Sequence, residues 1–367
     1  MTGSGGPAAD ADAPLGVYVH IPFCSSRCDY CAFATWTDRH QLIDEYLAAL
    51  RLDITRTFAR RQSVDGRRAE TVFVGGGTPS LVPPAGLVAA LAEIPLAEGA
   101  EVTVEANPDD VDAELLGVLA SGGVNRISLG VQSMVPRILD RLGRRHDPDN
   151  VRRAVAAIGA VGFASFNLDL IYGTATETID EWRTTLDAAL HLDPPHISAY
   201  GLTVEAGTPL AADPARYPND DVQADQYELA DDVLCGAGLA NYEVSNWARP
   251  GHECRHNHLY WSQHDYVGFG CAAHSHVTGR RWWNLRTPER YLAAVAADEP
   301  TEAAGETLDA ATRRIEGLQL ALRTTDGVPR EALDGDALDG LVEANGDRWV
   351  LTRRGRLLAN EVSVRLR

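Results

Sequence analysis

The stretch Cys24-Ser-Ser-Arg-Cys28-Asp-Tyr-Cys31-Ala-Phe33 is the most informative part of this sequence. Its three cysteines have C-x3-C-x2-C spacing, which allows three thiolates to surround one face of an iron–sulfur cluster. A cubane cluster with about four irons then has one iron without a protein ligand, open to a small molecule. Tetrahedral zinc would need a fourth nitrogen or sulfur ligand, and no Cys or His occurs in the few residues after Cys31. Three cysteines also cannot all pair with one another as disulfides.

Composition narrows the class of protein. The chain has 367 residues and a formal net charge of −19, which argues against a general nucleic-acid binder because such proteins need a basic face. It contains no lysine, so Schiff-base chemistry through a lysine is excluded. No stretch approaches the about 20 uninterrupted apolar residues of a membrane span. Six cysteines without a secretory signal indicate a reducing cytoplasm, and Cys235, Cys254 and Cys271 are expected to be small buried apolar residues.

The residues around the cysteines resemble a known family. Tyr18-Val-His20-Ile-Pro-Phe-Cys24-x3-Cys28-x-Tyr30-Cys31 is similar to the cluster loop of radical S-adenosylmethionine (SAM) proteins. More narrowly, it resembles the oxygen-independent coproporphyrinogen III oxidases and their relatives, the haem chaperones of the HemW type. The resemblance implies a 4Fe–4S cluster on Cys24, Cys28 and Cys31, with SAM on the free iron. An electron donor would reduce the cluster, and SAM would be cleaved to a 5′-deoxyadenosyl radical.

Short apolar runs alternate with amphipathic ones from residue 15 to about residue 210. The pattern predicts six strands, at 15–20, 70–74, 100–106, 126–131, 166–171 and 196–202. It predicts helices at 38–62, 84–94, 112–121, 149–161 and 179–191. Six strand–helix units favour a parallel α/β fold. The family resemblance implies an open (β/α)6 partial barrel, and a doubly wound sheet is the alternative from the sequence alone.

We divide the chain into four parts. These are a disordered tail at 1–14, the partial barrel at 15–210, an extension at 211–300 with a His and aromatic cluster, and a smaller C-terminal α+β domain at 301–367. The segment 241–275 is expected to be irregular with short strands. In the C-terminal part, a helix at 310–322 and elements at 338–345, 349–352 and 358–366 resemble a winged-helix module, with helices followed by a short hairpin. Its arginines, from Arg348 to Arg367, are interpreted as a solvated face.

Polar and glycine residues near strand ends are candidates for SAM binding. In β/α barrels the carboxyl ends of the strands carry the site, and a glycine run after a strand lets backbone approach a ligand closely. A structural ion pair or cap is the alternative for each polar residue alone. The family resemblance implies SAM contacts for the following residues: Tyr18, Tyr30, Gly76, Gly77, Thr78, Glu105, Gln132, Arg144, Asp169 and Gly201.

A second cluster follows at Cys254-Arg-His256-Asn257-His258-Leu-Tyr260-Trp261, with His274 farther on. Its His-Asn-x-x-Tyr-Trp pattern resembles a segment of the haem chaperones. Imidazole is a common axial ligand of haem, and aromatic rings suit a porphyrin face. The haem candidates are His256, Asn257, Tyr260, Trp261, Cys254 and His274, with His256 first as axial ligand. A structural role, with the His side chains bonded to backbone, is the alternative.

Two functions compete. The first is a haem chaperone that binds haem and delivers it to acceptor proteins, with no catalytic residue assigned. The second is the coproporphyrinogen III oxidase, which removes two propionate carboxyls by radical chemistry. The oxidase has a further cysteine where this chain has Phe33, an apolar residue where we align His274, and a long N-terminal extension where only a short tail precedes Leu15. These departures favour the chaperone. A related radical methyltransferase or cyclopropanase is a third possibility.

Overall fold

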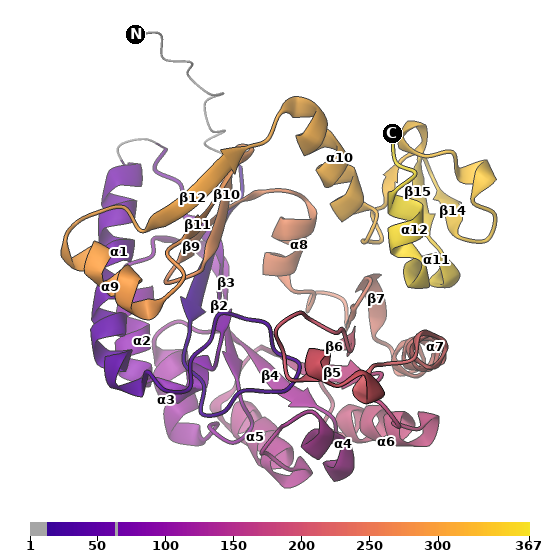
Figure 1. Ribbon diagram of the computed structural model, residues 1–367, viewed down its shortest axis with the longest axis horizontal. Coiled ribbons are helices and arrows are strands. Elements are labelled where there is room, and N and C mark those ends of the chain that lie inside the picture. Colours follow the sequence, from indigo (N-terminus) through magenta and orange to yellow (C-terminus); the bar gives the residue numbers. More distant parts are fainter. Residues whose placement is uncertain (1–12, 63–64) are drawn as a thin grey trace.

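Residues 13–62 and 65–367 are described by the computed structural model shown in Figure 1. Most of the predicted tail at 1–14 therefore lies outside the described residues. The six predicted strands are present and mutually parallel. They are β1 (Leu15–Ile21), β2 (Ala69–Gly76), β3 (Leu96–Ala106), β4 (Arg126–Gln132), β5 (Ser165–Tyr172) and β6 (His196–Gly201).

Helices follow the strands on one side of this sheet. They are α1 (Ile43–Gln62), α2 (Pro84–Leu91), α3 (Ala113–Ser121), α4 (Pro136–Arg141), α5 (Pro148–Val161), α6 (Ile179–Leu190) and α7 (Asp220–Gly236). Neighbouring helices contact one another, α1 with α2, α2 with α3, α3 with α5 and α6 with α7, so they form one layer. In a doubly wound sheet the helices would cover both faces. The partial-barrel prediction is therefore confirmed, and Figure 1 shows the helices around the outside of the curved sheet.

The sheet is larger than the sequence predicted. Its twelve strands have the order β12-β11-β10-β9-β1-β2-β3-β4-β5-β6-β8-β7, so it is open at both ends. Strand β9 pairs in parallel with β1, with Tyr18 opposite Gly268. The segment 211–300 thus extends the barrel sheet at both edges. Its strands, with β12 from the following segment, are β7 (Ala240–Glu243), β8 (Asn246–Ala248), β9 (Asp265–Phe269), β10 (His274–Val277), β11 (Arg280–Asn284) and β12 (Glu302–Thr307).

Local sequence explains most of these elements. In α1, the buried side chains Tyr46, Leu50, Ile54 and Phe58 recur at helical spacing and face the sheet. In α6, Thr178 caps the helix together with Glu181 in a capping box. The helices that were not predicted include α4, which is only six residues long, and α8 (Arg255–Trp261), which replaces an expected irregular segment. Short helices bury few residues, so their periodicity is weak in the sequence.

The other helices and turns complete the chain. The remaining helices are α9 (Pro288–Ala296), α10 (Ala310–Ala321), α11 (Arg353–Leu357) and α12 (Ala359–Ser363). The 3₁₀ turns are η1 (His40–Leu42), η2 (Pro79–Leu81), η3 (Leu210–Ala212), η4 (Pro214–Arg216), η5 (Arg330–Ala332) and η6 (Gly335–Ala337). Among the described residues, no helix combines the length and the apolar character that crossing a membrane would require.

The C-terminal unit has a small core of its own and a three-stranded sheet, in the order β13 (Val328–Pro329), β15 (Arg348–Leu351), β14 (Val342–Asn345). The sequence predicted helices followed by a hairpin at the end of the chain. This order is wrong, because the β14–β15 hairpin precedes helices α11 and α12. Two of its arginines are also not simply solvated. Arg353 and Arg356 form ion pairs with Asp231 of α7 at 2.7 and 2.8 Å. The Asp231 side chain is buried, so these pairs fasten the unit to the barrel.

Candidate functional site

The three cysteines lie on a loop that leaves the carboxyl end of β1. The loop is closed on itself by backbone hydrogen bonds, from Trp36 N to Pro22 O at 2.8 Å and from Cys24 N to Trp36 O at 3.1 Å. His20 holds the returning end, because its Nε2 donates to Ala34 O at 2.9 Å while its Nδ1 accepts from the Tyr18 hydroxyl. These contacts are made by backbone atoms and by the side chains of His20 and Tyr18, and none of them uses a cysteine side chain.

All three thiols border one cavity of about 660 Å³ at the carboxyl ends of the parallel strands. Two thiols already accept hydrogen bonds, Cys24 Sγ from Thr78 Oγ1 at 3.6 Å and Cys28 Sγ from Arg144 Nη1 at 3.4 Å. Burial raises the pKa of Cys24 and Cys31. Three cysteines beside one cavity, two of them accepting hydrogen bonds from side chains, are the kind of donor set that holds an iron–sulfur cluster when the thiols are deprotonated. Among the described residues, no three His, Cys, Asp or Glu side chains converge on the position of a single metal ion.

The glycine run after β2 is shaped by its close contact with the cluster loop. Gly77 N donates to Ile21 O at 2.7 Å, and a Cβ at Gly77 would lie 2.6 Å from Phe23 O. Gly76 has φ +110°, and a Cβ there would lie 2.4 Å from the His20 ring. Only glycine allows this approach. The run therefore places Thr78 next to Cys24 at the cavity wall.

Two carboxyl groups line the cavity, Glu105 on β3 and Asp169 on β5, with β4 between the two strands. Asp169 accepts hydrogen bonds from Ser128 Oγ and Asn167 Nδ2, both at 2.8 Å, and Glu105 Oε2 accepts from Gly76 N at 3.3 Å. Burial, and secondly the charge of Asp169, raises the pKa of Glu105 to about 8. Burial raises the pKa of Asp169 as well. Such groups suit a ligand that brings hydroxyls and positive charge.

Arg144 connects the cluster loop to the strands. Besides Cys28, its guanidinium donates to Asn107 Oδ1 at 2.6 Å and to Gly130 O at 3.0 Å. Gln132, at the end of β4, has φ +62°, which is uncommon for a residue other than glycine. The pairing of β4 with β5 is irregular at this point, between Gly130 and Gln132. Strained residues of this kind cluster at functional sites.

Every predicted SAM residue except Tyr18 lines this cavity. Tyr18 instead lines a second cavity on the other side of the cluster loop. Several lining residues were not predicted from the sequence, among them Asn107, Ser128 and Tyr200. Ser128 shares the inward face of β4 with Gly130, two positions along, so strand alternation could have found it. Asn107 comes directly after β3, two residues beyond the predicted Glu105.

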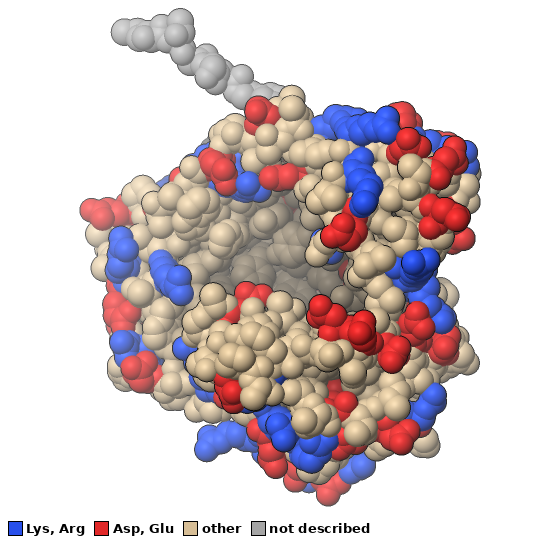
Figure 2. All heavy atoms as spheres, turned by 45° about the vertical axis from the view of Figure 1, so that its right-hand side comes forward, with Lys and Arg blue, Asp and Glu red and all other residues tan. Residues whose placement is uncertain are grey.

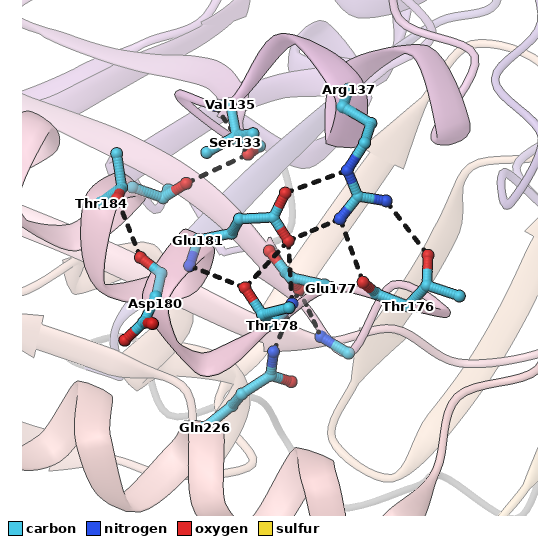
Figure 3. A network of polar contacts seen from close by, with 12 residues as sticks. Ser133, Val135, Arg137, Thr176, Glu177, Thr178, Asp180, Glu181, Thr184 and Gln226 are labelled. Atoms are coloured by element: carbon cyan, nitrogen blue, oxygen red, sulfur yellow. Dashed lines mark hydrogen bonds and ion pairs between the residues drawn. The ribbon is translucent and has the colours of Figure 1, made fainter.

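The loops after β4 and β5 are held by the polar network in Figure 3. Arg137 of α4 bonds both carboxylate oxygens of Glu181, at 3.0 and 2.5 Å, and also the hydroxyl and carbonyl of Thr176. Glu177, pointing inward, accepts from Gly173 N and from Gln226 Nε2 of α7. The network fixes the loop that follows the strand of Asp169. It also connects α7 to the barrel.

The predicted haem residues fall into two groups, one buried and one more exposed. His256, on α8, is only 1% exposed; its Nδ1 and Nε2 form hydrogen bonds with Thr71 Oγ1 and the Tyr260 hydroxyl, both at 2.8 Å. Its ring stacks on Phe73 of β2, and burial lowers its pKa to about 3. Cys254 is also buried, and burial raises its pKa to about 12.

The other haem candidates are more open. Tyr260 and His274 line the second cavity, whose volume is about 640 Å³. Asn257 and Trp261 are partly buried on α8. Figure 2 shows that the molecule is deeply hollowed on this face, with mostly uncharged side chains inside the hollow and acidic ones along part of its rim.

Comparison with known proteins agrees with this geometry. The family model described as the Radical SAM superfamily matches residues 18–189. A protein of Mycobacterium tuberculosis named heme chaperone HemW is 42% identical, over 95% of this chain and 94% of its own length. The Escherichia coli protein of the same name is 36% identical, over 95% of this chain and 97% of its own. The chain belongs to the HemW family of radical SAM proteins.

The fold has also been seen in a solved structure. Coproporphyrinogen III oxidase (HemN) from Escherichia coli superposes with a TM-score of 0.83, covering 97% of this chain and 91% of that one at 24% identity. At that identity the likeness concerns the fold alone. The HemW relatives align over nearly the whole chain. The family assignment therefore applies to the barrel, the extension and the C-terminal unit.

Proposed function

We propose that this chain is a radical SAM haem chaperone, which binds haem and delivers it to acceptor proteins. It carries a 4Fe–4S cluster on Cys24, Cys28 and Cys31, and SAM in the adjoining cavity. The observation that carries the cofactor assignment is that the three thiols and nearly all predicted SAM residues border one cavity. The haem assignment is supported by the HemW relatives, which are named heme chaperones and align over nearly the whole chain. An electron donor and the acceptor proteins are its further partners, in the cytoplasm.

The chain's own residues prepare the cavity for these groups. Arg144 and Thr78 donate hydrogen bonds to two of the thiols and so stabilise their anionic forms. Asp169 and Glu105 provide acceptors for the hydroxyl and ammonium groups of SAM, and Ser128 and Asn167 hold Asp169 in place. When bound, the cluster and SAM supply one-electron radical chemistry, and the surrounding protein excludes water.

Coproporphyrinogen oxidation is the second candidate, because the sequence around the three cysteines also resembles that of the oxidases. Phe33 argues against it. In this chain a phenylalanine, 67% exposed, occupies the position next to the cluster loop where the family resemblance implies a cysteine in the oxidase. A phenyl ring cannot donate a proton or a hydrogen atom as a thiol does.

The proposed function is tested by anaerobic reconstitution with iron and sulfide, followed by parallel assays. The reconstituted protein is titrated with haem, and a haem-loaded sample is incubated with a haem-free acceptor protein to follow transfer by absorbance. Binding and transfer of haem are expected. A reconstituted protein that binds no haem contradicts the proposal.

We expect the Asp169→Ala and Glu105→Ala variants to keep the cluster and to bind SAM more weakly. Each loss should be about 1–3 kcal/mol, or roughly 5- to 150-fold in Kd, because polar groups of the ligand are left without partners. Equilibrium dialysis with labelled SAM measures it. Glu177→Gln is the matched control, because Glu177 is a buried carboxyl outside the cavity. Parent-like SAM affinity in both cavity variants would show that these positions do not contact SAM.

We expect the reconstituted protein, supplied with reductant and SAM, not to convert coproporphyrinogen III to protoporphyrinogen IX. The reason is the absence of a thiol at position 33. Chromatography of the extracted porphyrins measures the product. Catalytic formation of protoporphyrinogen IX would restore the enzyme assignment, and the variant Phe33→Cys tests whether position 33 is responsible.

A further inference from the structure

The second cavity is a separate, formed site next to the cluster cavity. Its volume of about 640 Å³ lies within the range of pockets that hold cofactor-sized ligands. Ala32 and Phe33 of the cluster loop border both cavities, so the two spaces share this wall. The second cavity lies between β1, the end of α8, strands β9–β11 and α10. No residue of the proposed cluster or SAM-binding set lies in its lining except Tyr18.

Its lining combines aromatic rings with imidazoles. Tyr18, Phe33, Tyr260 and Tyr266 provide flat apolar surfaces, and four histidines line the same space: His20, His264, His274 and His276. Aromatic surfaces pack well against a planar macrocycle, and imidazole is the usual axial donor to haem iron. This combination suits an iron porphyrin better than a small polar metabolite.

The four histidines differ in the hydrogen bonds that their ring nitrogens form. His274 and His276 are two residues apart on β10, so their side chains point to the same side of the strand. Ser275, between them, does not line the cavity. His276 Nδ1 donates to His264 O at 3.3 Å, and its Nε2 is buried without a hydrogen-bond partner among the described residues. Both ring nitrogens of His20 are engaged.

Among these four histidines, His274 is the exposed one. Its ring is exposed and stacks on Trp283 of β11, with ring centres 5.9 Å apart. Among the described residues neither of its ring nitrogens has a hydrogen-bond partner. By contrast, both ring nitrogens of the buried His256 are occupied.

The cavity also holds positive charge in a strongly acidic protein. Arg281 is already paired with Glu306 and Glu316. Arg286 is exposed, lines the same cavity, and has no ion-pair partner within residues 13–62 and 65–367. An unpaired guanidinium at the mouth of an aromatic cavity fits a carboxylate at the edge of an apolar ligand.

We propose that the second cavity binds haem, with the His274 imidazole as an axial ligand of the iron and Arg286 contacting a propionate. This inference rests on the proposed function, since it assigns the site at which the chaperone holds its cargo. It moves the axial ligand away from His256, the first candidate from the sequence. The neighbouring His256 instead acts as part of the packing under the cavity.

Haem titrations followed in the Soret band test the site. His274→Ala should weaken haem binding roughly tenfold or more and change the Soret spectrum, and free imidazole should restore a ligated spectrum in that variant. His276→Ala should keep the parent spectrum. Circular dichroism checks the fold, and the exposure of His274 makes its variant safe for folding.

Arg286→Ala should weaken haem binding about threefold, the effect of one exposed charge pair. It should leave the binding of haem dimethyl ester, which lacks the carboxylates, unchanged. A parent-like Soret band in folded His274→Ala, or a loss confined to His276→Ala, overturns the assignment of His274. Failure of the parent itself to bind haem contradicts the proposed function instead, so the two failures are distinguishable.

Discussion

Replacing Cys28 by Ala is expected to abolish the cluster. The parent should take up about four irons and four sulfides per chain on anaerobic reconstitution, and the variant close to none. Two thiols cannot hold a cubane cluster against loss to solution, and the variant also removes the acceptor of the Arg144 hydrogen bond. Iron and sulfide analysis together with the visible absorbance of the cluster measure the effect. The same loss is expected for Cys24→Ala and Cys31→Ala.

The control for this experiment is Cys235→Ala. The expectation that Cys235 is buried is wrong, because it is exposed on α7. It lies outside the cavity, so its removal should leave iron uptake unchanged. Comparison of the two variants distinguishes the loss of a cluster ligand from the loss of a thiol elsewhere in the protein. A full complement of iron in folded Cys28→Ala would refute the assignment of the cluster ligands.

The His256→Ala variant is expected to lose stability rather than a haem ligand. It leaves Thr71 Oγ1 and the Tyr260 hydroxyl without their partner, and it opens a cavity beside Phe73. We expect the free energy of unfolding to fall by about 2–4 kcal/mol, from one cavity and two unpaired buried groups. Urea unfolding followed by tryptophan fluorescence measures the change. Under conditions where the variant is folded, its Soret band with haem should match that of the parent.

The matched control is His191→Ala, which removes an exposed imidazole at the end of α6 and should change stability by about 0.5 kcal/mol or less. If instead His256→Ala is as stable as the parent and loses the Soret band, then His256 is the axial ligand. Such a result would also require the buried α8 region to open when haem binds.

The cluster loop and the barrel could be predicted from the sequence for a physical reason. Cys24, Cys28 and Cys31 lie close together along the chain, so their spacing alone brings them to one place. The strands β1 to β6 and the longer helices each repeat a local pattern of apolar residues, and parallel strands bring their carboxyl ends to one edge. Glu105 and Asp169 could therefore be assigned to one cavity although they are far apart in sequence.

The second cavity could not be predicted in this way. Strand β9 pairs with β1 across more than half of the chain, and the further pairing of β10 with β9 and of β11 with β10 brings His274 and Arg286 to the cavity that Phe33 of the cluster loop also lines. Short elements such as α8 and β10 have too few residues for a clear periodicity, and no local signal tells which of their side chains face inward.

The sequence by itself determined the clustering of Cys24, Cys28 and Cys31 and the parallel α/β fold, and it predicted polar residues near strand ends that line the neighbouring cavity, because these depend on local spacing and on strand ends. The tertiary structure decided which histidine is buried and which one lines an accessible cavity. His256 and His274 are both polar residues near aromatic ones in the sequence. Only the packing of α8 against β2 buries the first, and only the pairing of β10 with β11 leaves the second open to a cavity. Burial and free ring nitrogens are properties of long-range contacts, so they become visible only in the folded chain.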